Sequence, residues 1–245
     1  MKLENKIALI SGSSRGIGKS IAEKFSLEGA KVILTYKNNY KLAKDISEKL
    51  DNSMVVKLDV SSKTSVTNTV KKILKKYDRI DILINNAGIN KPTDFEKIKE
   101  KDWDVILNTN LKGPFLLSQQ IFPIMKKQNF GRIINISSVS GQYGGPRTVH
   151  YAVSKAGLIS LGHCLSRFGA DYNITVNNIA PGIIDTEMSK NVVKSKTGKE
   201  ILSKVLLKRS GHPSDVSNLA VFLSSDESSY ITGQTYNVNG GLVFS

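Results

Sequence analysis

The chain has 245 residues, a length suited to one α/β domain, and its 40% hydrophobic and 23% charged residues exclude a disordered or collagen-like chain. Its net charge of +14 is compatible with a nucleic-acid partner, an acidic substrate or a lysine-rich solvated surface. The one cysteine, Cys164, excludes an internal disulfide and a thiolate metal site, which fits a reducing compartment. The sequence starts without the apolar run of a secretion signal and nowhere reaches the roughly 18 apolar residues of a membrane helix, so we expect a cytoplasmic protein without a membrane partner.

Apolar, β-rich runs alternate along the chain with segments of helical spacing, which is the pattern of βαβ units around a parallel sheet. The runs are mostly continuous in hydrophobicity, as in strands that are buried on both faces. The expected strands are Lys6 to Ser11, Lys31 to Tyr36, Met54 to Val60, Ile80 to Asn85, Arg132 to Ser137, Ile174 to Ala180 and Thr235 to Val238. We therefore predict an α/β fold of the Rossmann type, a doubly wound, parallel seven-stranded sheet with helices on both faces, as a single domain over residues 1–245. A polar helical segment at residues 185–209 interrupts this rhythm and is the expected substrate lid.

A glycine-rich loop joins the first strand to the first helix. Gly12, Gly16 and Gly18 lie in a Gly-x-x-x-Gly-x-Gly pattern, which suits a tight turn whose backbone N–H groups face a phosphate at a helix N-terminus. A flexible turn is the alternative, but the position between a strand and a helix favours a dinucleotide site. The loop residues expected to bind the cofactor are Gly12, Ser14, Arg15, Gly16, Ile17 and Gly18.

The end of the second strand bears on the choice of cofactor. An acid there would bind the adenosine ribose and favour NAD, but the sequence reads Thr35-Tyr36-Lys37-Asn38. Arg15 and Lys37 are cations suited to a ribose 2′-phosphate, although either could be an ordinary surface charge. We therefore predict NADP(H) as the preferred cofactor, with NAD(H) possible.

Tyr151 and Lys155 are four residues apart on an expected helix, so both face one ligand. A phenol of pKa near 10 needs a nearby cation to exchange protons at neutral pH, and Lys155 is expected to lower that pKa. Such a pair is often accidental, but Ser138 follows the fifth strand, where its hydroxyl can hydrogen-bond a substrate carbonyl oxygen. Asn110 lies inside a long expected helix, where asparagine usually marks a cap, a kink or a solvent contact.

These motifs together resemble the short-chain dehydrogenase/reductase family over essentially the whole chain. The resemblance implies that Tyr151 is the general acid/base, that Lys155 lowers its pKa and holds the nicotinamide ribose, that Ser138 orients the carbonyl, and that Asn110 positions a proton-relay water. It further implies homo-oligomers, usually dimers or tetramers. The additional cofactor contacts that it implies are Asp59, Asn86, Ala87, Gly88, Pro181, Gly182 and Thr186. Asp59 could instead cap the next helix through Ser61 or Ser62.

Within this family the chain is most similar to bacterial reductases of 3-oxoacyl-acyl-carrier-protein, which implies a thioester substrate and possibly a carrier-protein partner. Those reductases carry two docking arginines where this sequence has Asn129 and Tyr172, and Lys126, Lys127 and Arg132 are a possible substitute patch. An NADP-dependent sugar or polyol dehydrogenase remains the alternative enzyme, and a cofactor-binding scaffold without turnover is the alternative of another class. Nucleic acid is a poor fit, because the lysines have little aromatic interleaving.

The expected lid has a strong positive charge. Between Ser189 and Arg209, seven cations against one acid give +6, which would steer an anionic handle such as a phosphopantetheine, coenzyme A or nucleotide sugar, unless the segment is a solvated helix face. The cations are Lys190, Lys194, Lys196, Lys199, Lys204, Lys208 and Arg209, and the acid is Glu200. The apolar side expected to cover the substrate comprises Val192, Val193, Ile201, Leu202, Val205 and Leu206.

Four further residues are less promising as site residues. His150 adjoins Tyr151, but neighbouring helix positions point about 100° apart, so packing or substrate contact is expected rather than a shared catalytic role. His163 and His212 are expected to be structural or exposed. Cys164 is expected to be a small buried hydrophobe. The histidines lack metal-ligand spacing, so we predict no catalytic metal.

Overall fold

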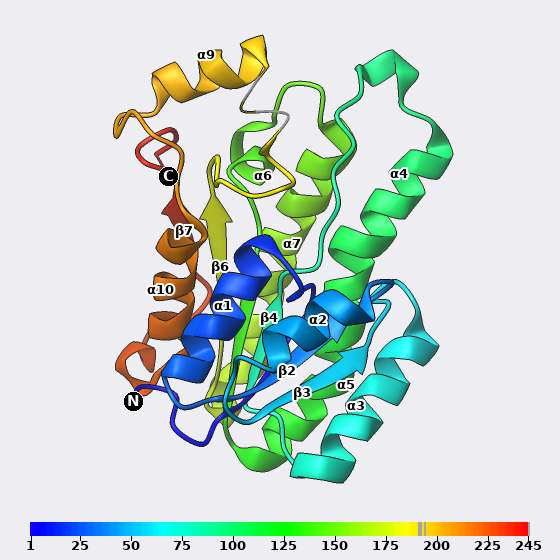
Figure 1. Cartoon of the computed structure of the whole chain (residues 1–245), viewed down its shortest axis with the longest axis vertical. Coiled ribbons are helices and arrows are strands. Elements are labelled where there is room, and N and C mark those ends of the chain that lie inside the picture. The colour runs from blue at the N-terminus through cyan, green and yellow to red at the C-terminus, as the bar shows by residue number, and fades with distance from the viewer. Residues whose placement is uncertain (191–192, 194, 245) are drawn as a thin grey trace.

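The computed structural model describes residues 1–190, 193 and 195–244. Strands and helices alternate, as the sequence predicts (Figure 1). The strands are β1 (Ile7–Ile10), β2 (Lys31–Tyr36), β3 (Ser53–Lys57), β4 (Ile82–Asn85), β5 (Gly131–Ile136), β6 (Ile174–Pro181) and β7 (Thr235–Val238). The α-helices are α1 (Gly16–Leu27), α2 (Tyr40–Ser47), α3 (Lys63–Tyr77), α4 (Glu100–Leu107), α5 (Gly113–Gln128), α6 (Ser140–Tyr143), α7 (Val149–Gly169), α9 (Lys196–Lys204) and α10 (Pro213–Ser224).

The seven strands form one parallel sheet in the order β3-β2-β1-β4-β5-β6-β7, which confirms the predicted fold class. The winding reverses between β1 and β4, and ligands of such sheets bind beyond the carboxyl ends of the strands at this point. Every expected strand is present, with ends shifted by no more than a few residues.

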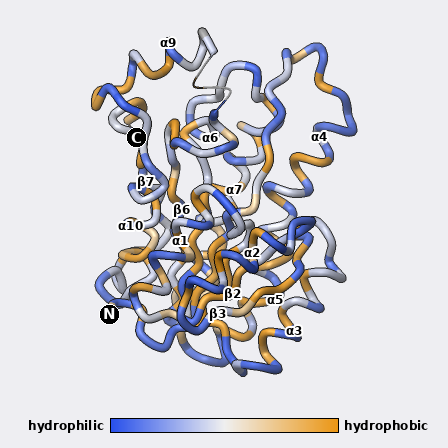
Figure 2. The backbone as a smooth tube through the Cα atoms, in the orientation of Figure 1, coloured by the Kyte–Doolittle hydropathy of each residue, from blue (hydrophilic) through white to orange (hydrophobic). Residues whose placement is uncertain are grey.

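Both faces of the sheet are buried, and this explains the continuous apolar runs. In β1, Ala8 and Ile10 pack under α1 and α10, whereas Ile7 and Leu9 pack under α3 and α5 on the other face. Successive side chains of a strand point to opposite faces, so a strand covered on both sides must be apolar throughout. Figure 2 shows the consequence: the central strands are hydrophobic and the rim loops are hydrophilic.

The carboxyl ends of the strands and the loops that follow them form one edge of the molecule. In Figure 1, α6 and α9 lie on the side toward which β6 points. The loop after β6 is tied back by an isolated bridge between Ile184 and Gly211. None of the helices in the described residues is long and apolar enough to cross a membrane.

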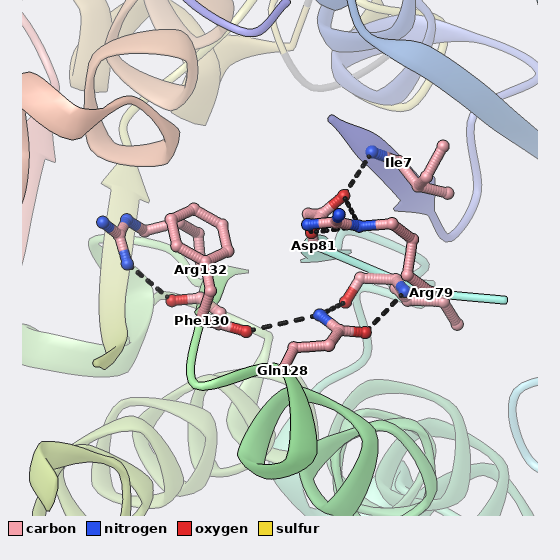
Figure 3. Close-up of polar contacts among 8 residues, drawn as sticks. Ile7, Arg79, Asp81, Gln128, Phe130 and Arg132 are labelled. Atoms are coloured by element: carbon pink, nitrogen blue, oxygen red, sulfur yellow. Dashed lines mark hydrogen bonds and ion pairs between the residues drawn. The ribbon is translucent and has the colours of Figure 1, made fainter. Parts of the chain in front are cut away.

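A polar network closes the opposite edge of the sheet (Figure 3). The buried carboxylate of Asp81 accepts the backbone N–H of Ile7 at 2.8 Å and the Arg79 Nε at 3.0 Å. The side chain of Gln128 accepts from the N–H of Ile80 and donates to its carbonyl oxygen. These contacts fix the amino ends of β1 and β4 and the end of α5, far from the edge where the candidate site lies.

Candidate active site

The glycine-rich loop has the backbone that its glycines predict. Gly12 and Gly16 adopt φ of +66° and +54°, values that side chains disfavour. Gly18 is required by close approach instead, because a Cβ there would overlap the carbonyl oxygen of Gly12 and the side chain of Asn86. At these three positions of the loop, only glycine fits without strain.

Buried hydroxyls and one amide hold this loop in place. Thr35, at 1% exposure, accepts the N–H of Gly12 at 2.9 Å and donates to the carbonyl of Ile10 at 3.0 Å. Asn86 donates through Nδ2 to the carbonyl oxygens of Ser11 and Gly12, both at 3.0 Å. The loops after β1 and β4 thus form one unit.

The N-terminus of α1 fits an anion. Arg15 precedes the helix, and within the described residues its side chain makes no capping hydrogen bond. The first N–H groups of a helix lack partners inside it and lie at the positive end of the helix dipole. Thr186, from the loop after β6, lies against Gly16, since a Cβ on Gly16 would be 3.3 Å from the Thr186 Cγ2. The expected cofactor residues of these two loops therefore meet, and they fit the pyrophosphate of a dinucleotide.

The two cations expected to bind a 2′-phosphate already have acidic neighbours. Arg15 lies 3.4 Å from Glu187 in an exposed pair. Lys37 Nζ lies 2.8 Å from Asp59 Oδ2. Burial opposes ionisation of Asp59, but hydrogen bonds from Lys37 and Ser61 outweigh it and lower the pKa of that carboxyl.

Asp59 also bears on how the next helix begins. Its Oδ1 accepts both the N–H and the hydroxyl of Ser61, while Ser62 caps α3 by accepting the N–H of Ser65. Asp59 therefore does not cap α3 itself, but it orders the turn that leads to the capping residue Ser62.

Ser138, Tyr151 and Lys155 converge where β5 ends and α7 begins. The Tyr151 and Ser138 side chains share a hydrogen bond. Lys155 is 4% exposed, donates from Nζ to the carbonyl of Ile136 at 2.6 Å, and lies 5.7 Å from the centre of the Tyr151 ring. A hydroxyl, a phenol and an amine thus lie together in one largely buried corner at this edge of the sheet.

The electrostatics of this corner correct one expectation. Burial raises the pKa of Tyr151 above its ordinary value, and the hydrogen bond with Ser138 opposes this rise. Burial also lowers the pKa of Lys155 to about 8, so desolvation opposes the lowering of the Tyr151 pKa that the sequence argument expected from this amine. Desolvation penalises the charged forms of both side chains, and it weakens the cation that the sequence argument relied on.

Asn110 lies in a single π-helical turn, Asn108–Lys112, between α4 and α5. Its fully buried amide accepts the N–H of Ile89 and donates to the Ile89 carbonyl, both at 2.9 Å, and donates to Ser154 Oγ at 3.1 Å. A Cβ built on Gly88 would lie 3.4 Å from Asn110 Oδ1 and 3.5 Å from Lys155 Nζ. Of the three possibilities left open for Asn110, a cap, a kink or a solvent contact, its burial excludes the solvent contact, and the distortion of the helix here is a π-turn, which is frequent at functional sites.

The remaining expected cofactor residues surround this corner. Ala87 donates its N–H to Ser11 Oγ at 3.0 Å, and Gly182 donates its N–H to the Val238 carbonyl at 2.9 Å. Pro181 ends β6 opposite Val238. Ser14 lies in the turn that leads into α1, and Ile17 lies in the first turn of that helix. The predicted residues from four strand ends therefore gather at one edge of the sheet.

Sequence reasoning missed two residues that support the site. Thr35 holds the glycine-rich loop, and its signal is a hydroxyl residue among the apolar residues of the second strand. Ser154 donates from Oγ to the carbonyl of Tyr151 at 2.7 Å and connects it to Asn110. Its signal is a hydroxyl residue directly before Lys155 in the sequence.

The structure corrects the substitute docking patch. Arg132 is 1% exposed, donates to the carbonyls of Gly131 and Asn173, and stacks 4.3 Å from the centre of the Phe130 ring (Figure 3). It cannot contribute to a docking surface. Lys126 remains exposed, with Nζ 4.0 Å from the Tyr172 ring centre.

Three other expectations can be compared with the structure. Cys164 is exposed, so the prediction of a buried hydrophobe is wrong: α7 leaves this position open to solvent. His150 is fully buried, whereas His163 and His212 are exposed. Among the described residues, no group of three or more His, Cys, Asp or Glu side chains could hold a metal ion.

The expected lid contains α9, and it has both buried and exposed apolar residues. Val205 is 2% exposed, whereas Leu206 is 61% and Met188 56% exposed. Val192 and Lys194 lie outside the described residues. The described lid therefore leaves large apolar side chains in contact with solvent beside the loop of Thr186.

A Rossmann-type sheet with a glycine-rich loop and a Ser, Tyr and Lys set defines a class of nicotinamide-dependent oxidoreductases. The family model described as Enoyl-(Acyl carrier protein) reductase matches residues 12–243. The chain belongs to the short-chain dehydrogenase/reductase family, and it is an oxidoreductase that acts on keto and hydroxyl groups with a nicotinamide cofactor.

Several curated relatives share one name. The chain is 42% identical over 249 residues to the 3-oxoacyl-(acyl-carrier-protein) reductase FabG of Thermotoga maritima, covering 99% of this chain and 100% of that protein. It is 41% identical over 243 residues to the protein of the same name from Escherichia coli, covering 99% of each. It is 39% identical over 247 residues to that of Aquifex aeolicus, again covering 99% of each.

Proposed function

We propose that this protein reduces 3-oxoacyl thioesters to 3-hydroxyacyl thioesters with NADPH. The observation that carries the proposal is the meeting of Ser138, Tyr151 and Lys155 at the same edge of the sheet as the uncapped N-terminus of α1. The names of the relatives, all similar over nearly their whole length, support the 3-oxoacyl substrate.

Each catalytic side chain has a role in this reaction. The cofactor, when bound, supplies a hydride to the carbonyl carbon of the substrate. Tyr151 gives the proton of its hydroxyl to the carbonyl oxygen, while Ser138 donates a hydrogen bond to that oxygen as negative charge develops on it. Lys155 holds the nicotinamide ribose and returns a proton toward Tyr151, and Asn110 positions the water of this relay. A pKa of about 8 suits Lys155 to proton exchange near neutral pH.

The cofactor is proposed to lie across the edge of the sheet. Gly12, Ser14, Gly16, Ile17 and Gly18 would hold the pyrophosphate at α1. The residues proposed for the adenine and the nicotinamide ends are Asp59, Asn86, Ala87, Gly88, Pro181, Gly182 and Thr186.

Arg15 and Lys37 are proposed to give the preference for NADP(H). Both are exposed, so the acidic partners that hold them can be exchanged for a phosphate at small cost. The double variant Arg15→Ala with Lys37→Ala should raise the KM for NADPH far more than the KM for NADH. Equal effects on the two cofactors would refute this assignment.

The chain is proposed to be a single domain, in which the substrate reaches the Ser138, Tyr151 and Lys155 site beneath residues 185–209. The exposed apolar side chains Met188 and Leu206 suit an acyl chain, and the lysines of the segment suit an anionic carrier handle. A carrier protein remains a proposed partner, although Arg132 cannot take part in docking it. Screening acetoacetyl thioesters against sugars and polyols with both cofactors tests the substrate class, and oxidation of a sugar or polyol in preference to thioester reduction would contradict it.

We propose a homo-oligomer, a dimer or tetramer. An apolar groove runs between the π-turn, α5 and α7, lined by Leu107, Leu111, Phe115 and Leu161. Phe115 is 43% exposed, which is costly for an aromatic side chain in water. Light scattering of the wild type and of Phe115→Glu tests this assembly, and a monomeric wild type at micromolar concentration would contradict it.

Removal of the phenol tests the catalytic proposal. Tyr151→Phe should lower the rate of NADPH oxidation with an acetoacetyl thioester by at least about 100-fold, the size of general acid catalysis. The variant should still bind NADPH in a fluorescence titration, which separates loss of chemistry from loss of the fold. Retention of more than about a tenth of the wild-type rate would contradict the role of Tyr151.

A further inference from the structure

The first turn of α7 carries Tyr151 but lacks its usual cap. Because α7 begins at Val149, Tyr151 is its third residue, and its N–H is among those without a partner inside the helix. Thr148 precedes the helix, and a threonine there normally accepts such an N–H. Within the described residues, however, the Thr148 side chain makes no cap hydrogen bond, and its buried hydroxyl has no partner.

His150 supplies the missing acceptor. Its Nδ1 accepts the N–H of Tyr151 at 3.0 Å, and its side chain is fully buried. Since Nδ1 accepts, the neutral ring carries its proton on Nε2. Burial lowers the pKa of His150, Asp102 opposes this shift, and Lys91 adds to it. The ring is therefore neutral near pH 7 and keeps its acceptor.

The carbonyl side of the same residue is held as well. Ser154 donates to the Tyr151 carbonyl at 2.7 Å, and Asn110 donates to Ser154 at 3.1 Å. Side chains thus bind both backbone polar groups of Tyr151, while its phenol bonds to Ser138. A shift of this helical turn would move the phenol oxygen away from Ser138, and misplacement of a reacting group by about 1 Å can cost up to about 100-fold in rate.

We propose that His150 is a positioning residue for the reaction. It holds the N–H of Tyr151 so that the phenol stays on Ser138, and it contacts neither substrate nor cofactor. The kinetic part of this inference rests on the proposed function, but the hydrogen bond can be tested without any substrate.

Two substitutions separate this role from simple packing. His150→Leu keeps an apolar volume and removes the acceptor. His150→Asn places Oδ1 the same number of bonds from Cα as Nδ1, so it can restore the acceptor. His163→Leu is the matched control, because His163 is exposed on the same helix.

The first readout is amide hydrogen exchange of the full-length protein at Tyr151, followed by NMR. We expect exchange at least about 10-fold faster in His150→Leu, and near wild-type exchange in His150→Asn and His163→Leu. Unchanged exchange in His150→Leu, or equally fast exchange in the Leu and Asn variants, would overturn the proposal. If His150→Leu does not fold, His150→Met makes the same comparison.

The second readout is steady-state kinetics with NADPH and an acetoacetyl thioester. We expect kcat to fall about 10-fold in His150→Leu with the substrate KM within about 3-fold of wild type, and His150→Asn to recover kcat to within about 3-fold. A KM effect without a kcat effect would contradict positioning. A wild type inactive with the thioester would refute the proposed function, while the exchange experiment would still decide the role of His150.

Discussion

The hydroxyl of Thr35 links the second strand to the glycine-rich loop, and its removal should weaken both the fold and cofactor binding. Thr35→Val keeps the shape of the side chain and deletes two hydrogen bonds, one from the N–H of Gly12 and one to the carbonyl of Ile10. The backbone N–H of Thr35 keeps its own bond to Ser13 Oγ at 2.7 Å, so the change is confined to the hydroxyl.

The expected magnitude follows from burial. Thr35 is 1% exposed, so the N–H of Gly12 loses its partner where water does not replace it easily. An unsatisfied buried donor costs about 1–3 kcal/mol. We expect a loss of about 2 kcal/mol in the free energy of unfolding, which lowers the Tm of a chain of this size by about 4–8 °C.

Thermal unfolding with and without NADPH is the assay. Because Gly12 belongs to the proposed cofactor loop, saturating NADPH should raise the Tm of Thr35→Val less than that of the wild type. Thr35→Ser is the control: it keeps the hydroxyl and loses a methyl group, so it should retain most of the NADPH effect. A Thr35→Val protein with wild-type Tm and a wild-type response to NADPH would refute this reasoning, as would a Thr35→Ser variant with an equally reduced response.

Three further outcomes are expected. Burial holds the pKa of Lys155 at about 8, below the value near 10.4 in the unfolded chain, so the unfolded state binds more protons between these two values. The stability of the wild type relative to Lys155→Met should therefore rise as the pH increases from about 8 to about 10. The expected rise is at most about 1.4 kcal/mol per pH unit. Urea unfolding across this range measures the difference, and a flat difference would contradict it. Gly18→Ala forces a Cβ onto the Gly12 carbonyl, so calorimetry should show that the free energy of unfolding falls by about 1–3 kcal/mol or more. A fluorescence titration should show loss of NADPH binding. A variant with wild-type stability and binding would exclude the clash. Asp94→Asn breaks an exposed ion pair with Arg147 at 2.7 Å, which ties the loop after β4 to the turn before α7. The free energy of unfolding should change by less than about 1 kcal/mol, while the substrate KM rises a few-fold at unchanged kcat. Steady-state kinetics that show a loss of kcat instead would argue against this role.

The sequence by itself determined the fold class and the order of the site residues. Continuous apolar runs such as Ile7–Ile10 are typical of strands covered on both faces, and a glycine at the start of a helix, such as Gly16, is typical of a tight turn. Parallel strands then place all their carboxyl ends on one edge. Local pattern and chain direction therefore sufficed to place Ser138 at that edge, and the resemblance to the family added its joint role with Tyr151.

The tertiary structure decided what depends on burial, because desolvation is set by neighbours that are distant in sequence. The sequence predicts that Arg132 is a surface cation, but in the structure Phe130 and the carbonyl of Asn173 enclose it. The pKa of Tyr151 rises rather than falls because the same packing that brings Lys155 near it removes water from both. Periodicity along the chain cannot contain this information, since the cost of a buried charge depends on everything that packs around it.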